Sequence, residues 1–177
     1  MEIVYYVACS LDGYIADRQG SVDWLNAIDD GEEDYGYEEF NQTLDGIVMG
    51  SRTYEFVLDH GEWVYPDHPS WVFTRRELPL AHPTVTLTKE DPTDLVASLA
   101  SRGLSRIWLV GGGALAASFA SERLITEFRI AVVPVLLGGG TRLLEGEFSA
   151  IGLELLGEKK YPNGMVHLDY RSIPRGD

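Results

Sequence analysis

The sequence has little cysteine and little basic charge, and both shortages limit what the protein can be. Cys9 is the single cysteine among 177 residues, which excludes an intrachain disulfide. With 14 lysines and arginines against 28 acidic residues, the formal net charge is -14, and the basic patch that nucleic acid or an anionic membrane needs is missing. No apolar run is long enough to span a bilayer, and no basic segment leads into a signal sequence. We therefore expect a cytoplasmic protein without nucleic-acid or membrane partners.

Several catalytic motifs are also missing. The sequence contains no Gly-x-Ser-x-Gly elbow and no Walker A lysine. Its four histidines do not have the spacing of metal ligands, so we expect no metal site. One cysteine cannot build the zinc site of a deaminase domain, and Cys9 itself is expected to be a small buried hydrophobe rather than a nucleophile.

The hydrophobic content of 45% suits one substantial core, and we predict one domain over residues 1–177. Short apolar runs alternate with helical patterns, which predicts an α/β fold with a mostly parallel central sheet and helices on both faces. Asn163-Gly164, between two alternating segments, predicts an antiparallel C-terminal hairpin at the sheet edge. The predicted strands are 3–9, 45–50, 70–74, 84–87, 107–110, 127–135, 153–161 and 165–172, and the predicted helices are 35–43, 52–58, 92–101 and 114–121.

The most informative stretch is 107–117, where an apolar strand runs into Gly111-Gly112-Gly113 and then into a helix-forming run. Glycines let a diphosphate approach the backbone, and the helix start offers unpaired N–H groups. A tight turn that only packs helix against sheet would use the same glycines, so this stretch alone leaves both interpretations open.

Three more patterns follow predicted strands. Residues 49–54, Met-Gly-Ser-Arg-Thr-Tyr, repeat the order of strand, glycine and helix start, which favours a long ligand with several phosphates. Thr74-Arg75-Arg76 is a candidate clamp for an isolated phosphate such as the one that separates NADP from NAD. Residues 133–142 end in a glycine-rich loop, which is either a flexible connection or a substrate-side loop with Arg142 facing an anionic group.

Acidic residues supply the remaining candidates. Asp12-Gly13 follows the first strand at the edge where open α/β sheets bind ligands, and it is either a simple turn or a carboxylate that orients a substrate or relays a proton. The acidic stretch 29–39 is best explained as a solvated loop and an exposed helix face. If a helix begins near Asp34, either Asp34 or Glu38 can stand beside a cleft. The acidic residues of this stretch are Asp29, Asp30, Glu32, Glu33, Asp34, Glu38 and Glu39.

Four of these motifs, in this order along the chain, resemble the dihydrofolate reductase-like superfamily. They are Ser10-Leu11-Asp12-Gly13, the 49–54 motif, Val110-Gly111-Gly112-Gly113 and the 134–140 segment, Pro-Val-Leu-Leu-Gly-Gly-Gly. Within that superfamily, the chain is most similar to the reductase domain of the bifunctional riboflavin-biosynthesis deaminase-reductase, over residues from about 3 to 172.

This resemblance implies an NADPH-dependent reductase that transfers hydride to a C=N or C=O carbon of a small heterocycle. The acceptor it implies is the ribosyl C1′ of 5-amino-6-(5-phosphoribosylamino)uracil. A dihydrofolate or pterin reductase is one alternative, and a non-catalytic module that binds a nucleotide or small molecule on the same fold is another. The resemblance also implies a homodimer.

The resemblance assigns positions to each part of the ligands. Asp12 is the expected polar group at the reacting centre, and Arg142 the expected receptor for a substrate phosphate. Trp24 either borders the substrate cleft or anchors the core. The nicotinamide carboxamide is assigned to the backbone of Ala8 and Ile15, and the phosphates are assigned to Gly50, Ser51, Arg52, Thr53, Gly111, Gly112, Gly113, Ala114 and Leu115.

The sequence also departs from the folate-reductase pattern. Ser51 and Ala114 stand where those enzymes often carry arginine, so any NADP preference falls to Arg52, Arg75 or Arg76. The folate-binding acid of the first helix has no unambiguous counterpart, which weakens the case for dihydrofolate.

Overall fold

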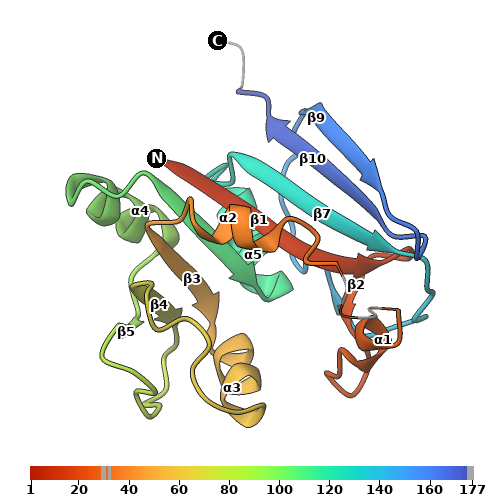
Figure 1. The fold of residues 1–177 in the computed structure, drawn as a ribbon. Coiled ribbons are helices and arrows are strands. Elements are labelled where there is room, and N and C mark those ends of the chain that lie inside the picture. Colours follow the sequence, from red (N-terminus) through yellow and green to blue (C-terminus); the bar gives the residue numbers. More distant parts are fainter. Residues whose placement is uncertain (29–30, 32, 175–177) are drawn as a thin grey trace.

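Six neighbouring parallel strands form most of one eight-stranded sheet, in the order β5-β4-β3-β6-β1-β7-β10-β9 (Figure 1). The structure is a computed structural model that describes residues 1–28, 31 and 33–174, so Asp29, Asp30 and Glu32 lie outside the described residues. β10 runs antiparallel between β7 and β9. The strands are β1 (Glu2–Ser10), β3 (Gly46–Gly50), β4 (Ser70–Phe73), β5 (Val85–Thr88), β6 (Arg106–Gly111), β7 (Glu127–Val133), β9 (Leu153–Lys160) and β10 (Val166–Ser172).

Helices cover both faces of this sheet, as the alternating pattern predicts. Ile3 and Tyr5 of β1 point into the core that α4 (Pro92–Ser101) and α5 (Gly113–Ser121) complete. Val4 points into the opposite core with residues of α2 (Tyr37–Asn41) and α3 (Ser51–Asp59), because successive side chains of a strand face opposite sides. In Figure 1, α2 lies in front of the sheet and α5 behind it. The predicted fold class is confirmed.

The predicted boundaries are right to within two residues. The largest difference is at α2, which is two residues shorter at each end than the predicted helix 35–43. It begins at Tyr37 because Tyr35 and Gly36 both have positive φ, 55° and 77°. A right-handed helix cannot include such residues. Three short elements were not predicted: β2 (Tyr14–Ala16), β8 (Thr141–Arg142) and α1 (Asp23–Asn26).

The C-terminal hairpin forms where Asn163-Gly164 predicts it. Gly164 has φ +88°, and the backbone N–H of Tyr161 donates to the carbonyl oxygen of Met165 at 2.9 Å. A register shift interrupts the β10–β9 pairing between Asp169 and Tyr170. The hairpin extends the parallel sheet with an antiparallel edge.

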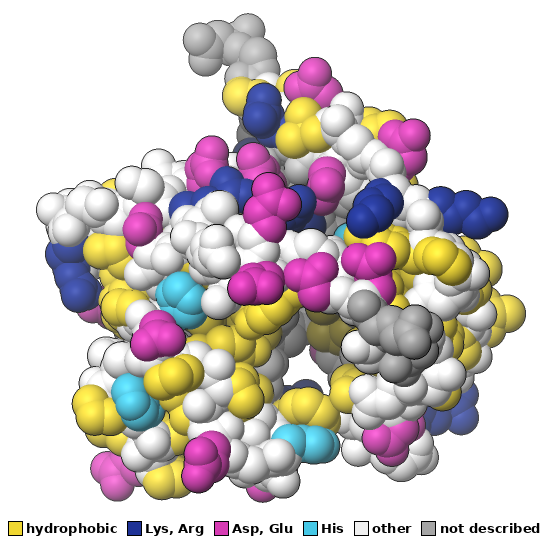
Figure 2. Space-filling model, viewed as in Figure 1, with side chains coloured by type: hydrophobic (Ala, Val, Ile, Leu, Met, Phe, Trp, Pro, Cys, Tyr) yellow, Lys and Arg dark blue, Asp and Glu magenta, His cyan; other side chains and the backbone are white. Residues whose placement is uncertain are grey.

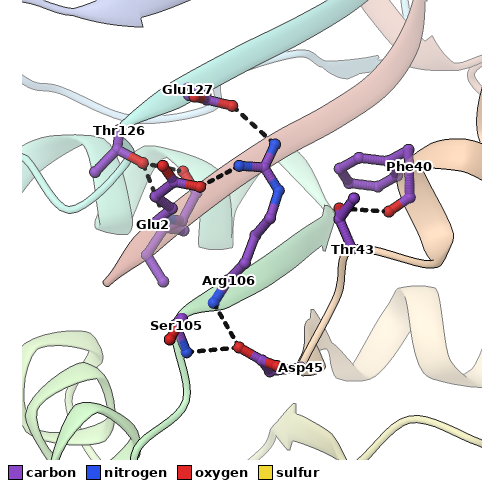
Figure 3. Close-up of polar contacts among 9 residues, drawn as sticks. Glu2, Phe40, Thr43, Asp45, Ser105, Arg106, Thr126 and Glu127 are labelled. Atoms are coloured by element: carbon purple, nitrogen blue, oxygen red, sulfur yellow. Dashed lines mark hydrogen bonds and ion pairs between the residues drawn. The ribbon is translucent and has the colours of Figure 1, made fainter.

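Arg106, at the amino end of β6, is bonded to residues at the amino ends of three other strands, as Figure 3 shows. Its guanidinium donates to the carboxylates of Glu2 on β1 and Glu127 on β7, the latter at 2.9 Å. Its backbone N–H donates to Asp45, just before β3, at 2.9 Å. These contacts hold β3, β6, β1 and β7 together at the edge opposite their carboxyl ends, where the candidate site lies.

Candidate active site

Two loops at the carboxyl ends of β1 and β7 hold each other, and we call residues 10–18 and 134–145 the paired loops. The Asp12 carboxylate joins them: it accepts from the backbone N–H groups of Gly138 at 2.7 Å and Leu137 at 3.1 Å, and from the Ser10 hydroxyl at 2.7 Å. The Ser10 hydroxyl and these backbone donors lower the pKa of Asp12 to about 2. The geometry therefore makes Asp12 an ionised acceptor that orients the loops. Its part in proton transfer stays a prediction.

Backbone contacts bring the paired loops closer still. The N–H of Leu11 donates to the carbonyl oxygen of Val135, and the N–H of Leu143 donates to that of Gly13, both at 2.9 Å. β2 and β8 pair as a separate antiparallel ribbon. Gly140 has φ +136°, and a Cβ there would collide with the backbone of β2. The glycine-rich loop predicted from residues 133–142 is thus a tightly packed element rather than a flexible connection.

The two predicted glycine-led helix starts meet at neighbouring strands. Gly50 begins α3 and Gly112 begins α5; neither helix start has a side-chain cap, and neither first turn contains an acidic residue. A Cβ on Gly50 would lie 3.8 Å from both the oxygen of Gly111 and the nitrogen of Gly112, which a cis peptide bond joins. Uncapped N–H groups at two adjacent helix starts suit an anion. The first turns of these helices contain Ser51, Arg52, Thr53, Gly113, Ala114 and Leu115.

Gly113 connects this glycine turn to the paired loops. Its carbonyl oxygen accepts from the backbone N–H of Glu145 at 3.0 Å. A Cβ at Gly113 would collide with the carbonyl oxygen of Arg142, so only glycine allows this approach. The predicted phosphate site and the predicted substrate loop therefore share one packing contact.

Among the arginines of the candidate site, one has side-chain partners and the others have none within the described part of the chain. Arg76 donates to both oxygens of Glu55, at 3.0 and 2.5 Å, and to the hydroxyl of Ser51 at 3.2 Å. Thr74 is buried, and its Oγ1 accepts from the backbone N–H of Arg76 at 3.0 Å. Arg75 differs, because it is exposed and its side chain has no hydrogen-bond or ion-pair partner within the described part of the chain. The same is true of the exposed side chains of Arg52 and Arg142.

The predicted nicotinamide and substrate residues gather around the carboxyl half of β1. Ala8 lies near the end of β1 and Ile15 lies in β2, and both are half-buried. Trp24 of α1 and Ala8 both pack against one hydrophobic cluster that contains Ala131 and Tyr161. Its indole Nε1 is buried and finds no hydrogen-bond partner among the residues that the structure describes. Trp24 therefore packs in the core, and its indole N–H remains available as a hydrogen-bond donor.

Asp34 stabilises the start of α2. Its carboxylate accepts from the backbone N–H groups of Gly36 at 2.9 Å and Glu38 at 3.2 Å, and these bonds lower its pKa. Glu38 is exposed on α2. This arrangement matches the exposed helix face that the acidic stretch predicts.

Figure 2 shows the surface hollowed between the part that carries α3 and the part that carries α1 and β2. α3 contains Arg52 and Thr53 and α1 contains Trp24, so the hollow separates the predicted cofactor side from the predicted substrate side. Two other depressions lie around Glu2 at the amino ends of the strands, and no predicted site residue lines them.

Comparison with known proteins agrees with this architecture. The family model described as the RibD C-terminal domain matches residues 2–167. The chain belongs to the RibD C-terminal domain family. It is 38% identical to the uncharacterised YwjB protein of Bacillus subtilis, over 94% of this chain and 95% of that protein, and 25% identical to the uncharacterised YyaP protein of the same organism, over 95% and 93%.

Solved structures show the same RibD C-terminal domain fold. The crystal structure of a Shewanella sp. PV-4 protein that carries a riboflavin-biosynthesis name matches with a TM-score of 0.90 at 30% identity, over 98% of this chain and 100% of that one. The bifunctional deaminase and 5-amino-6-(5-phosphoribosylamino)uracil reductase of Thermotoga maritima matches with a TM-score of 0.71 at 15% identity. That match covers 97% of this chain and 56% of the bifunctional protein, and it shows the fold alone.

Two features of this RibD C-terminal domain were not predicted. The partners of Asp12 are backbone N–H groups 125 and 126 residues away, which no sequence pattern marks. The second feature is His167 on β10, whose ring lies beside Tyr6, Tyr35 and Tyr161. The alternation of polar and apolar residues in β10 could have indicated that His167 faces one side of the sheet.

Among the described residues, no helix is long and apolar enough to cross a membrane.

Proposed function

We propose that this protein is an NADPH-dependent reductase of the 5-amino-6-(5-phosphoribosylamino)uracil reductase type. The observation that supports the proposal is the meeting of two helix starts without side-chain caps, at Gly50 and Gly112. Gly50 lies close to the backbone of Gly111 and Gly112 there. Such a junction offers several free N–H donors to a diphosphate without a basic side chain.

The residues around this junction fit NADPH. Arg75 and Arg52, which have no partner within the described part of the chain, supply positive charge for an additional phosphate, whereas Arg76 is neutralised by Glu55. The backbone of Ala8 and Ile15 would hold the nicotinamide side. When bound, NADPH supplies the hydride, and the protein supplies orientation and electrostatics.

The substrate side contains the groups that would position an acceptor. The guanidinium of Arg142 has no partner among the described residues and would receive a substrate phosphate, and the buried Nε1 of Trp24 is a donor for a heterocycle. Asp12 and Asp34 each accept two backbone N–H bonds and carry lowered pKa values, so they are ionised at neutral pH. The proton that the reduction consumes therefore comes from water or another group.

Titration with NADPH and with NADH, followed by quenching of tryptophan fluorescence, tests the cofactor. Assays that follow the consumption of NADPH by its absorbance, with 5-amino-6-(5-phosphoribosylamino)uracil or with dihydrofolate as the acceptor, then test the substrate. Selective NADPH binding with turnover of the pyrimidine supports the proposal. Turnover of dihydrofolate alone assigns a folate reductase, binding without turnover assigns a binding module, and failure to bind either nucleotide overturns the proposal.

A further inference from the structure

His167 lies in one cross-strand row with the predicted nicotinamide residue. Ala8 of β1 is paired with Ala131 of β7, and Ala131 is paired with His167 of β10. Directly paired residues point to the same face of a sheet, and neighbouring strands lie about 4.8 Å apart. His167 therefore faces the same side as Ala8 at a distance of roughly 10 Å, two strand spacings away. The one position between them is Ala131, whose side chain is small.

The imidazole of His167 differs from those of the other three histidines. His60 bonds the carbonyl oxygen of Phe56 at 2.7 Å, His68 bonds Asn41 at 3.1 Å, and His82 bonds Thr84 at 2.9 Å. By contrast, neither ring nitrogen of His167 has a hydrogen-bond partner in the parts of the chain that the structure describes. A half-buried ring with two unused polar atoms loses free energy unless a ligand or solvent satisfies them.

Aromatic rings enclose His167 on this face. The ring centroids of Tyr161, Tyr6 and Tyr35 lie 4.9, 6.0 and 6.1 Å from that of His167. The charged groups that face it are Asp169 on its own strand, Arg129 on β7 and Lys159 on β9. Asp169 and Arg129 are bonded to each other at 2.9 Å, and the Lys159 ammonium lies over the Tyr161 ring. Asp169 and Arg129 thus neutralise each other, whereas Lys159 contacts an aromatic ring, and burial lowers the pKa of His167.

We propose that His167 is a substrate-recognition residue, whose imidazole hydrogen-bonds the edge of the heterocycle of the acceptor. The inference rests on the proposed function, because it takes the Ala8 end of the row as the place of the nicotinamide. A planar heterocycle suits both the distance along the row and the tyrosine rings that surround its far end. A neutral imidazole offers one donor and one acceptor, which matches the mixed donor and acceptor edge of an aminopyrimidine.

Two substitutions distinguish recognition from packing. His167→Phe keeps an aromatic ring among the three tyrosines and removes both polar nitrogens, while His167→Gln keeps a donor and an acceptor and removes the ring. The expected result for His167→Phe is a KM for the acceptor that rises about tenfold or more, with NADPH affinity and thermal stability close to those of the wild type. His167→Gln is expected to keep KM within about threefold. His60→Gln, at an exposed histidine that follows α3 and bonds the carbonyl oxygen of Phe56 in it, is the matched control.

The acceptor in these assays is whichever of 5-amino-6-(5-phosphoribosylamino)uracil and dihydrofolate the wild type reduces. A KM that rises in His167→Phe and stays near the wild-type value in His167→Gln supports recognition. An unchanged KM in His167→Phe overturns the inference and leaves the proposed function standing. The same holds if His167→Gln lowers the stability of the protein and leaves KM unchanged. A wild type that binds no NADPH overturns both.

Discussion

The Oδ2 atom of Asp12 lies 2.7 Å from the backbone nitrogen of Gly138, 126 residues further along the chain. The contact joins the loop after β1 to the loop after β7 at the carboxyl edge of the sheet. A carboxylate that accepts backbone N–H groups is a strong acceptor when ionised and a poor one when protonated. The arrangement of the paired loops therefore depends on the charge of Asp12.

Asp12→Asn should loosen the paired loops, because an amide replaces an ionised acceptor. We expect turnover to fall about tenfold or more while NADPH affinity stays close to that of the wild type, since Asp12 lies on the predicted substrate side. Asp17→Asn is the matched control, because Asp17 accepts backbone N–H groups only within its own loop. Equal turnover in the two variants would contradict a role for the Asp12 contact.

The Asp12 contact also predicts a pH dependence of stability. Its pKa in the folded protein is about 2, below the ordinary 3.8, so the stabilisation is fully present above about pH 4 and is lost as the pH falls toward 2. The difference in unfolding free energy between wild type and Asp12→Asn should shrink between pH 5 and pH 3. Urea unfolding at both pH values measures it, and a constant difference would count against the assignment.

Gly113→Ala should destabilise the fold, because the added methyl group collides with the carbonyl oxygen of Arg142. We expect a loss of about 1–3 kcal/mol in the free energy of unfolding, the usual range for overpacking. Gly157→Ala is the control, since a Cβ there meets nothing within 4 Å. Urea denaturation of both variants tests this, and similar losses would show that the close approach tolerates a side chain.

Arg75→Ala should lower NADPH affinity about tenfold and leave NADH affinity unchanged, if Arg75 binds the additional phosphate. Arg171→Ala removes another exposed arginine, on β10, and serves as the control for the general loss of positive charge. Fluorescence titrations with both nucleotides measure the effect. A parallel loss for NADPH and NADH would instead place Arg75 near a phosphate that both share.

We propose the β9 edge as the contact of the predicted homodimer. β9 ends the sheet order, and Leu153, Leu155 and Leu156 are 41%, 51% and 45% exposed. Antiparallel pairing of two copies about a twofold axis can place Glu154 opposite Lys159 of the second copy. Leu155→Lys with Leu156→Lys should convert the dimer to a monomer in analytical ultracentrifugation, whereas Leu80→Lys, at a leucine that is 61% exposed, should not. A monomeric wild type would refute the predicted dimer.

Local sequence chemistry predicted the elements whose ends are marked by particular residues. Asp91-Pro92 marks the start of α4, and the predicted range equals the observed Pro92–Ser101. Asn163-Gly164 locates the hairpin turn because positive φ is needed there. The glycine turn at 111–113 was predicted because three glycines stand between an apolar strand and a helix-forming run, a signal that is also contained in adjacent residues.

The remaining features depend on contacts between distant segments. β2 and β8 contain three and two residues, too few for any periodicity, and they exist because the paired loops meet. α2 begins at Tyr37, two residues later than predicted, because Tyr35 has a positive φ that its residue type does not indicate. Arg75 and Arg76 look alike in sequence, and the position of Glu55 and Ser51 on α3 gives Arg76 partners that Arg75 does not have within the described part of the chain.

The position of β1 also has a consequence for synthesis. β1 pairs on one side with β6 and on the other with β7, so both neighbours of the first strand are made roughly a hundred residues later. At typical translation rates, β1 remains unpaired for on the order of ten seconds before β6 and β7 have been synthesised. The nascent chain therefore carries an unpaired strand with two tyrosines until β6 and then β7 have been made, so the centre of the sheet closes late in synthesis.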